Sequence, residues 1–376
     1  MGSALYVHVP FCRHKCIYCD FYSIITTDNI SPYLTALKKE IKNYAEAYSG
    51  NNQFKSIFFG GGTPSLLPPA EIANIIDALR KNYNVCADAE VTLEANPGTI
   101  DKDKLEQFRT AGINRLSVGI QSFDENDLKF LTRIHSNQQA DAAIKDAREA
   151  GFENINLDLI FNLPKQTKEK WLVNLRHAAD LPVTHISAYS LILERGTILN
   201  KLVLDGKVKI ADEDYDAMLY EETINYLNSK GFVQYEVSNF AKPGYECRHN
   251  LAYWEYDNYL GFGPSAHSFA NGKRWWNYSS LKKYIAEIER NGSACSGSEV
   301  LTDEQKLEEY VMLALRSRGL KKNEFSKLFN NNWLLKNESR FNEYIKNNLL
   351  YLNGDMLCLT AKGYAVCDEI LAEILG

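Results

Sequence analysis

The residues that could do chemistry are concentrated near the start of the chain, where Cys12, Cys16 and Cys19 have the spacing C-x3-C-x2-C. Three thiolates this close together can wrap one small metal centre, because each short gap lets the loop curl back. A structural zinc site and a fully protein-ligated iron–sulfur cube each take four ligands. Three thiolates would leave one iron of a four-iron cube open to another ligand. The alternatives are a chance cluster of buried cysteines and a zinc loop completed by a remote ligand.

The composition indicates a soluble protein with a substantial core. The chain has 376 residues, 45% of them hydrophobic, and a mean hydropathy of -0.33, which suits a large domain with an appendage. A net charge of -6 argues against nucleic acid as a partner, because phosphate binding needs a basic surface. There is no membrane-spanning run and no signal-peptide pattern, so we expect a cytoplasmic protein without an intrinsic membrane anchor. We predict that the remaining cysteines are structural, buried thiols: Cys86, Cys247, Cys295, Cys358 and Cys367.

The cysteine loop follows the first of six alternating strands and helices. The apolar run from Leu5 to Val9 alternates like a buried strand and stops at Pro10. Strict alternation of this kind predicts an α/β fold with a parallel sheet that curls into a partial (β/α)6 barrel. We predict the later strands at 54–59, up to Glu94, 114–121, 155–160 and 185–190, and helices near 31–47, 70–82, 101–111, 124–131, 137–150 and 167–179.

Polar and glycine residues fall at the predicted C-terminal ends of these strands, where a parallel barrel carries its functional groups. Gly60–Pro64 follows the second strand, and Glu94, Gln121 and Asp158 lie at the ends of later ones. Consecutive glycines let a ligand approach the backbone, and their N–H groups can hold a carboxylate. Each residue alone has an ordinary explanation, since Asp158 could cap a turn and Gln121 could bond backbone. Their convergence with the cysteine loop predicts one binding site.

The cysteine motif after the first strand resembles the signature of the radical S-adenosylmethionine (SAM) superfamily. The flanking Y-x-H-x-P-F-C, with an aromatic residue before the third cysteine, is similar to the coproporphyrinogen-oxidase-like branch of that superfamily. The resemblance implies that Cys12, Cys16 and Cys19 hold a 4Fe–4S cluster whose open iron chelates the amino and carboxylate groups of SAM. The residues that match the SAM-binding pattern are Tyr6, Tyr18, Gly61, Gly62, Thr63, Glu94, Gln121, Arg133 and Asp158.

The chemistry of these side chains suits SAM, which has a ribose, a sulfonium, an ammonium and a carboxylate. Glu94 and Asp158 can accept hydrogen bonds from an ammonium or from ribose hydroxyls, and Arg133 can donate two bonds to a carboxylate. One turn departs from the family pattern, because Asn162 stands where the family has the glycine of a G-L-P turn. Asparagine tolerates positive φ better than other non-glycine residues, so we expect the turn to be kept.

Beyond Asn200 a helix (212–229) and a strand (232–237) are predicted to close the barrel, and an aromatic, glycine-rich segment follows. Imidazole is a common axial ligand of haem iron, and aromatic side chains make flat apolar walls. The sequence H-N-L-A-Y-W from His249 resembles the H-N-x-x-Y-W motif associated with haem binding in the HemW branch. The resemblance implies that His249 is a haem ligand or pocket residue. The alternative is a domain junction in which His249 and His267 are satisfied by hydrogen bonds.

The end of the chain is predicted to be a small, mostly helical, winged-helix-like domain. A helix follows Thr302, a hairpin turns at Asn353–Gly354, and a last helix closes the chain. We therefore predict a radical SAM barrel domain at 1–240, a connecting segment with the H-N-x-x-Y-W motif at 241–299, and a C-terminal domain at 300–376. A winged-helix fold does not by itself establish DNA binding, and the acidic chain favours packing between domains or with a partner.

Two functions share the predicted SAM site. One is that of the oxygen-independent coproporphyrinogen III oxidases, which decarboxylate two propionates. These oxidases have a fourth cysteine where this chain has Phe21. They also have a long N-terminal extension before the first strand, whereas Tyr6 is near the start of this sequence. C-D-F together with H-N-x-x-Y-W matches the haem-chaperone branch. We predict a haem chaperone that delivers haem to acceptor proteins such as respiratory haem proteins and lacks the oxidase activity. The oxidase, or a radical SAM enzyme with another substrate, is the alternative. Productive SAM cleavage, the axial haem ligands and a homodimer are left open.

Overall fold

The computed structural model describes residues 3–26, 28–48, 50 and 52–376. Its largest element is one sheet of twelve strands in the order β12-β11-β10-β9-β1-β2-β3-β4-β5-β6-β8-β7. The strands from β1 to β6 are parallel neighbours in chain order, which confirms the predicted partial barrel. They are β1 (Ser3–Val9), β2 (Phe54–Gly61), β3 (Val85–Ala95), β4 (Arg115–Gln121), β5 (Asn154–Phe161) and β6 (His185–Ser190).

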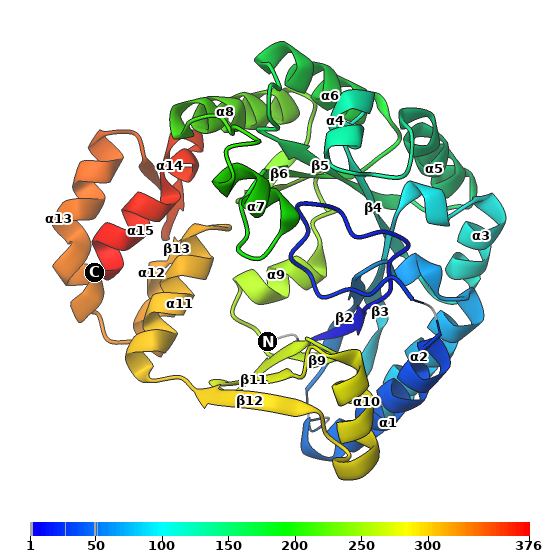
Figure 1. The fold of residues 1–376 in the computed structure, drawn as a ribbon. Helices are drawn as coiled ribbons and strands as arrows, with labels where there is room; N and C mark the ends of the chain where they lie inside the picture. Colours follow the sequence, from blue (N-terminus) through cyan, green and yellow to red (C-terminus); the bar gives the residue numbers. More distant parts are fainter. Residues whose placement is uncertain (1–2, 27, 49, 51) are drawn as a thin grey trace.

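Helices form an outer layer around these parallel strands (Figure 1). Parallel neighbours need a crossover connection, and a helix supplies it after each strand. In the first helix Tyr33, Leu37, Ile41 and Tyr44 recur every three or four residues, and all four are buried in the main core. The crossover helices are α1 (Ile30–Tyr48), α2 (Pro69–Asn82), α3 (Lys102–Thr110), α4 (Glu125–Phe130), α5 (Asn137–Glu149) and α6 (Lys168–Asp180).

Both ends of the parallel sheet are extended by further strands, of which the sequence analysis predicted only β7. On one side β8 and then β7 add antiparallel to β6. On the other side β9 pairs parallel with β1, and three antiparallel strands continue the sheet. The runs are short, and most of them lie in the aromatic, glycine-rich segment, so the sequence analysis did not identify them as strands. They are β7 (Val233–Glu236), β8 (Asn239–Ala241), β9 (Tyr259–Phe262), β10 (His267–Ala270), β11 (Lys273–Asn277) and β12 (Cys295–Val300).

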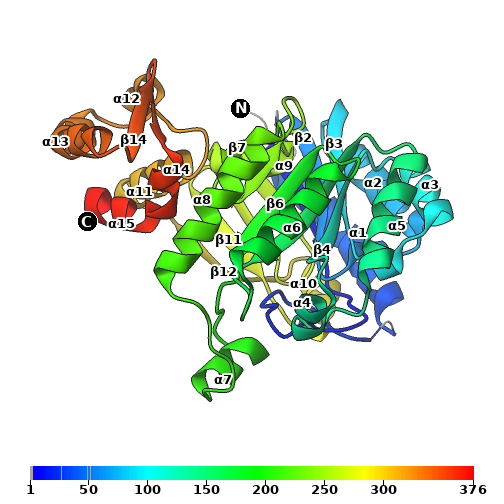
Figure 2. The same cartoon turned by 90° about the horizontal axis from the view of Figure 1, so that it is seen from above.

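Four more helices connect these strands to the barrel: α7 (Ile198–Leu204), α8 (Glu213–Ser229), α9 (Arg248–Trp254) and α10 (Leu281–Asn291). Helix α7 projects from the body of the molecule on the side where the N-terminal loop lies (Figure 2). The two are joined, because the Leu199 N–H donates to the Ile17 carbonyl at 2.9 Å. Helix α7 therefore stands beside the loop that carries the cysteines.

The C-terminal region has its own core, formed by residues between Val311 and Ile374. Thr302 and Gln305 form a capping box at the start of α11, and β14 pairs antiparallel with β15, so the predicted helix and hairpin are confirmed. The module lies beside α8 and α9 (Figure 1), and the Val237 N–H donates to the Arg316 carbonyl at 2.8 Å. Its elements are α11 (Asp303–Leu315), β13 (Leu320–Lys321), α12 (Lys322–Leu328), α13 (Asn332–Lys346), β14 (Leu350–Asn353), β15 (Met356–Leu359), α14 (Ala361–Ala365) and α15 (Cys367–Leu375).

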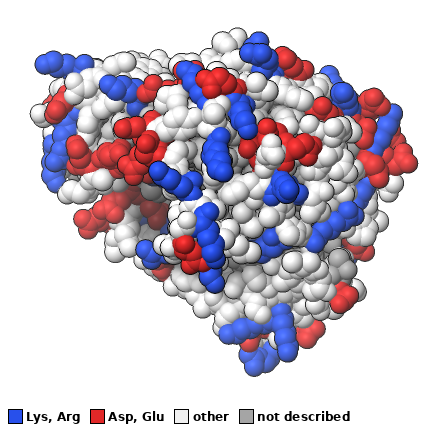
Figure 3. Space-filling view, turned by 45° about the horizontal axis from the view of Figure 1, so that its top comes forward, with Lys and Arg blue, Asp and Glu red and all other residues white. Residues whose placement is uncertain are grey.

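The surface carries charges of both signs, and three of the five cysteines outside the N-terminal loop are buried. Acidic and basic side chains lie intermixed over the face in Figure 3. In the described part of the chain, none of the helices has the length and apolar character needed to cross a bilayer. Cys247, Cys358 and Cys367 are buried as predicted, but the prediction is wrong for Cys295, which is exposed, and Cys86 is only half-buried. Cys295 lies on β12, the strand at one end of the sheet, where side chains face solvent.

Candidate cluster and SAM site

The loop after β1 presents the cysteines because its two ends are tied together. The Cys12 N–H donates to the Ile24 carbonyl at 2.9 Å, and the Ile24 N–H donates to the Pro10 carbonyl at 2.7 Å. Phe11 anchors the base of the loop in the core, where its ring meets the Tyr33 ring edge-on at 5.4 Å. The three cysteines between these anchors are half-buried and line one cavity of about 540 Å³.

The surroundings of the cysteines fit a cluster with thiolate ligands. Thr63 Oγ1 donates to Cys12 Sγ at 3.5 Å, and Arg133 Nη1 donates to Cys16 Sγ at 3.7 Å. Burial raises the pKa of the Cys19 thiol to about 11, so its thiolate needs a positive partner such as iron. No three His, Cys, Asp or Glu side chains of the described residues are arranged around a single metal ion. A cluster differs from one ion in this respect, because each cysteine binds a separate iron.

Asn96, which sequence reasoning did not select, links the donors of two cysteines. Its Nδ2 donates to Thr63 Oγ1 at 3.0 Å, and its Oδ1 accepts from Arg133 Nη2 at 2.6 Å. Arg133 also donates to the Gly119 carbonyl. One amide therefore fixes both side chains that hydrogen bond to Cys12 and Cys16. Its position directly after β3, two residues beyond Glu94, is the signal that could have identified it.

The glycines of the G-G-G-T-P turn are required by packing inside the protein. Gly61 has φ +107°, and a Cβ there would lie 2.5 Å from the His8 ring, while a Cβ at Gly62 would lie 2.7 Å from the Phe11 carbonyl oxygen. The backbone N–H groups also have protein partners. Gly61 N–H donates to Glu94 Oε2 at 3.2 Å, and Gly62 N–H donates to the Val9 carbonyl at 2.8 Å. In the structure, β1 and the loop after it lie against the backbone of these glycines, at the close distance that the sequence analysis expected for a ligand.

Glu94 and Asp158 are half-buried carboxyl groups that line the same cavity. Burial, followed by the charge of Asp158, raises the pKa of Glu94 to about 8. Burial also raises the pKa of Asp158, although Asn156 Nδ2 donates to its Oδ1 at 2.8 Å and opposes this shift. A cation or a hydrogen-bond donor that binds beside these groups would favour their charged forms. This part of the cavity is therefore matched to a ligand with ammonium or hydroxyl groups.

The other predicted SAM residues line the same cavity. Tyr6, Tyr18, Gln121 and Arg133 all face it with the cysteines, and Thr63 lies between Cys12 and Asn96. Gln121 ends β4 with φ +73°, an unusual conformation for its residue type, and the register of β4 and β5 shifts there. Asn162 has φ +60°, as expected from its place in the turn after β5. The predicted residues therefore come together in one cavity.

His249 is also in this cavity, but as a buried and doubly bonded imidazole. It is 1% exposed, its Nδ1 lies 3.0 Å from Ser56 Oγ and its Nε2 lies 3.0 Å from Tyr253 OH. Its ring stacks on Phe58 with centroids 4.9 Å apart. Burial lowers the pKa of His249 to about 3, so the ring is neutral. His267 is elsewhere, exposed on β10 and stacked on the Trp276 ring.

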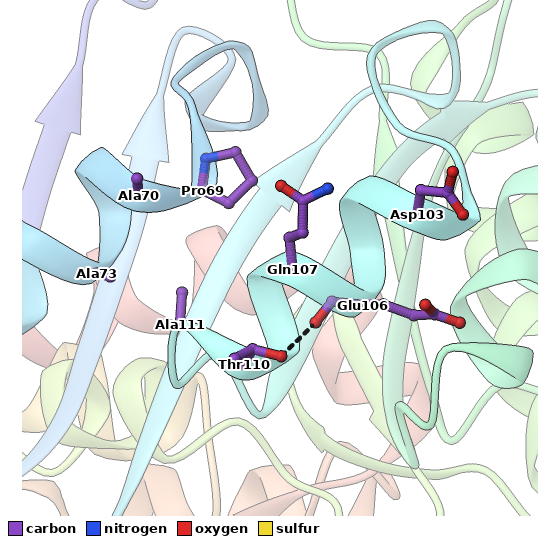
Figure 4. Close-up of a pocket in the computed structure, with 8 residues that line it drawn as sticks. All are labelled: Pro69, Ala70, Ala73, Asp103, Glu106, Gln107, Thr110 and Ala111. Carbon is purple, nitrogen blue, oxygen red and sulfur yellow. Dashed lines mark hydrogen bonds between the residues drawn. The ribbon is translucent and has the colours of Figure 1, made fainter.

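Sequence reasoning missed most of the polar side chains in the inner part of the cavity. Alternation along strands could have found them, because positions two apart face the same side. Arg115, Ser117, Gly119 and Gln121 follow this pattern on β4, and all four line the cavity. A separate hollow of about 630 Å³ lies between α2 and α3 (Figure 4). Its lining is mainly small side chains with Asp103 and Glu106, and it contains none of the predicted site residues.

The barrel, the C-x3-C-x2-C loop and the polar residues at its strand ends define a radical SAM protein. The profile of the Radical SAM superfamily matches residues 6–178, and that of the HemN C-terminal domain matches residues 301–366. Members of this superfamily hold a 4Fe–4S cluster and SAM.

Full-length relatives define the family more narrowly. "Heme chaperone HemW" of Bacillus subtilis (strain 168) is 35% identical over 379 residues, with 100% of each chain covered. The protein of the same name from Escherichia coli (strain K12) is 40% identical over 275 residues, covering 72% of this chain and 71% of that one. The chain belongs to the HemW family. The solved structure of Escherichia coli coproporphyrinogen III oxidase (HemN) has a TM-score of 0.83 at 26% identity, covering 99% of this chain and 90% of that one.

Proposed function

We propose that this protein is a haem chaperone that binds haem in the barrel cavity and delivers it to acceptor proteins such as respiratory haem enzymes. The observation that carries the proposal is the full-length similarity to relatives named heme chaperones. A second observation supports it, since the H-N-x-x-Y-W histidine faces the same cavity as the three cysteines. The cargo and the metal site would therefore share one chamber.

In this proposal Cys12, Cys16 and Cys19 hold a 4Fe–4S cluster, whose open iron is the binding point for SAM. Arg133 is well placed for the methionyl carboxylate, because its guanidinium lies beside Cys16. Glu94 and Asp158 are suited to the ammonium or ribose hydroxyl groups, since a donor there would favour their charged forms. The proposed SAM-binding residues are Tyr6, Tyr18, Gly61, Gly62, Thr63, Glu94, Gln121, Arg133 and Asp158.

The proposed division of the chain is a barrel domain at 1–240, a connecting segment at 241–299 and a C-terminal domain at 300–376. The separate core of the last region supports its boundary. The connecting segment contributes β9–β12 to the main sheet and α9 to the cavity wall. It therefore supplies His249, which we propose as a haem ligand or pocket residue.

Two variants separate the haem and cluster parts of the site. His249→Ala should weaken bound haem or shift its absorption bands while leaving the cluster absorption intact, because the His249 ring nitrogens bond Ser56 and Tyr253. Cys16→Ala should lose the cluster first, because a ligand is missing. Absorption spectra during haem titration and cluster reconstitution measure both. An unchanged haem spectrum and affinity in His249→Ala would remove His249 as a ligand.

The alternative function is the coproporphyrinogen III oxidase, which the similarity to the solved Escherichia coli oxidase favours. Phe21, 61% exposed at the edge of the cavity, stands where the oxidase pattern has a cysteine. An anaerobic assay of the cluster-reconstituted protein with reductant, SAM and coproporphyrinogen III decides between the two. We expect haem binding and no protoporphyrinogen. Catalytic formation of protoporphyrinogen with 5′-deoxyadenosine would contradict the proposal.

A further inference from the structure

The cavity that begins at the cysteine loop continues inward to Arg115 at the start of β4. Arg115 lines the cavity together with His249 and Tyr253, yet the residue is only 2% exposed. Since β4 places its other cavity residues further along the strand, Arg115 occupies the end opposite the cysteines. A guanidinium here is a permanent positive charge inside the barrel.

The protein does not satisfy this guanidinium. Among the described residues, none forms a hydrogen bond with the Arg115 side chain, and its Nε is buried without a partner. Its one ion pair is long, with 4.0 Å between Nε and Glu90 Oε2. Thr92, paired with Arg115 across β3 and β4, has a buried Oγ1 that also lacks a partner. A buried cation without hydrogen bonds is costly, so this position favours a ligand that supplies acceptors.

Glu90 is not available to fill that role because other groups already hold its carboxylate. Its Oε2 accepts from the Arg248 N–H at 3.1 Å, and its Oε1 accepts from the His249 N–H at 3.2 Å and from the Cys247 thiol at 3.4 Å. These bonds cap the start of α9. Glu90 therefore partly balances the charge of Arg115 while leaving the donors of the guanidinium free.

The other acidic groups of the cavity, Glu94 and Asp158, hydrogen bond to other partners and not to the guanidinium. Glu94 Oε2 accepts from the Gly61 N–H at 3.2 Å. Asp158 is engaged by Asn156 at 2.8 Å. The surrounding walls are partly aromatic, because Tyr6, Phe58 and Tyr253 line the same cavity. A carboxylate carried on a flat apolar body fits this combination of a free guanidinium and aromatic walls.

We propose that Arg115 binds a carboxylate at the inner end of the cavity and, resting on the proposed function, that this carboxylate is a propionate of haem. A guanidinium and a carboxylate form two parallel hydrogen bonds, which would fix orientation as well as affinity. Haem would then bind with a propionate edge inward, beside α9. Arg115 is therefore a cargo-binding residue, distinct from the residues proposed for SAM.

The test compares haem with haem dimethyl ester, whose propionates carry no charge, on the full-length, cluster-reconstituted protein. The affinity of each is measured by absorbance titration for the native protein, Arg115→Gln and Arg115→Lys. Arg248→Gln is the matched control, because Arg248 is solvent-exposed and pairs with Asp88 at 3.3 Å outside the cavity. A charge-assisted pair of this kind corresponds to about 10- to 100-fold in affinity.

We expect the native protein and Arg248→Gln to prefer haem over the ester, and Arg115→Gln to lose about 10- to 100-fold in haem affinity with ester affinity unchanged. Arg115→Lys should keep part of the preference, since it retains the charge and loses the two-pronged geometry. If Arg115→Gln does not fold, the ratio of haem affinity to ester affinity in Arg115→Lys, compared with that of the native protein, decides. Equal affinities of the native protein for both compounds, or equal losses for both in the variants, would overturn the proposal. Absence of any haem binding by the native protein would instead refute the haem-chaperone function on which it rests.

Discussion

Asn96 is predicted to control the stability of the cluster without touching a cysteine. In Asn96→Ala, Thr63 loses a donor at 3.0 Å and Arg133 loses an acceptor at 2.6 Å. One neutral bond and one bond to a charged group together contribute about 2–4 kcal/mol to the fold. The two bonds to sulfur that depend on them are longer and weaker, and we assign them about 1–2 kcal/mol together. Loss of that amount would release the cluster about 5- to 30-fold faster.

The assay follows the decay of the cluster absorption after addition of an iron chelator under anaerobic conditions. Asn174→Ala is the matched control, because this buried asparagine accepts from the Phe123 N–H at 2.6 Å and from Ser122 Oγ at 3.1 Å, away from the cysteine loop. It should destabilise the fold by a comparable amount and release the cluster at the native rate. Hydrogen bonds to cluster sulfurs also set the reduction potential, so Asn96→Ala should have a more negative potential. Equal decay rates and potentials in the two variants would refute this reasoning.

Two further predictions concern the fold around the site. Burial raises the pKa of Glu40 from 4.5 to about 7. Between these two pH values the native state keeps a proton that the unfolded chain releases. The free energy of unfolding should therefore fall by about 3 kcal/mol as the pH rises from 4.5 to 7, and then level off. Urea unfolding at pH 5 and pH 8 should show that Glu40→Gln becomes more stable relative to the native protein at the higher pH. The same stability difference between the two proteins at both pH values would contradict the assignment. Gly61→Ala should lower the thermal unfolding temperature and the cluster yield, because its Cβ would lie 2.5 Å from the His8 ring. Gly98→Ala serves as the control, because its Cβ would have no other atom within 4 Å. Equal unfolding temperatures for these two variants would count against the packing role of Gly61.

The parts of the fold that follow short, local rules could be predicted from the sequence. Strand and helix alternation is encoded in periods of two and of three to four residues, so the parallel strands and their order were accessible. The conformation of Asn162 followed from its residue type, since asparagine tolerates positive φ. Glu94, Gln121 and Asp158 could be assigned to one site because the ends of parallel strands meet at one edge.

Contacts that depend on neighbouring strands could not be predicted. Asn96 links Thr63 and Arg133, which are far apart in the chain, and only their positions in the barrel bring them together. Arg115 looked like an ordinary residue at the start of a strand, and its missing partners are a property of the packed interior. Gln121 adopts positive φ where its residue type gives no warning. In each case the determining interaction is tertiary.

The most direct test of the haem-chaperone proposal is a haem-transfer measurement. The cluster-reconstituted protein is loaded with haem, freed of unbound haem and mixed with the apo form of a b-type respiratory cytochrome, and the acceptor's absorption bands are followed with time. Apomyoglobin, which collects any haem that simply dissociates, gives the reference rate. The account predicts that haem moves to the cytochrome faster than to apomyoglobin and leaves the chaperone by the same amount. Transfer to both at one rate, or a protein that holds no haem to transfer, would contradict it.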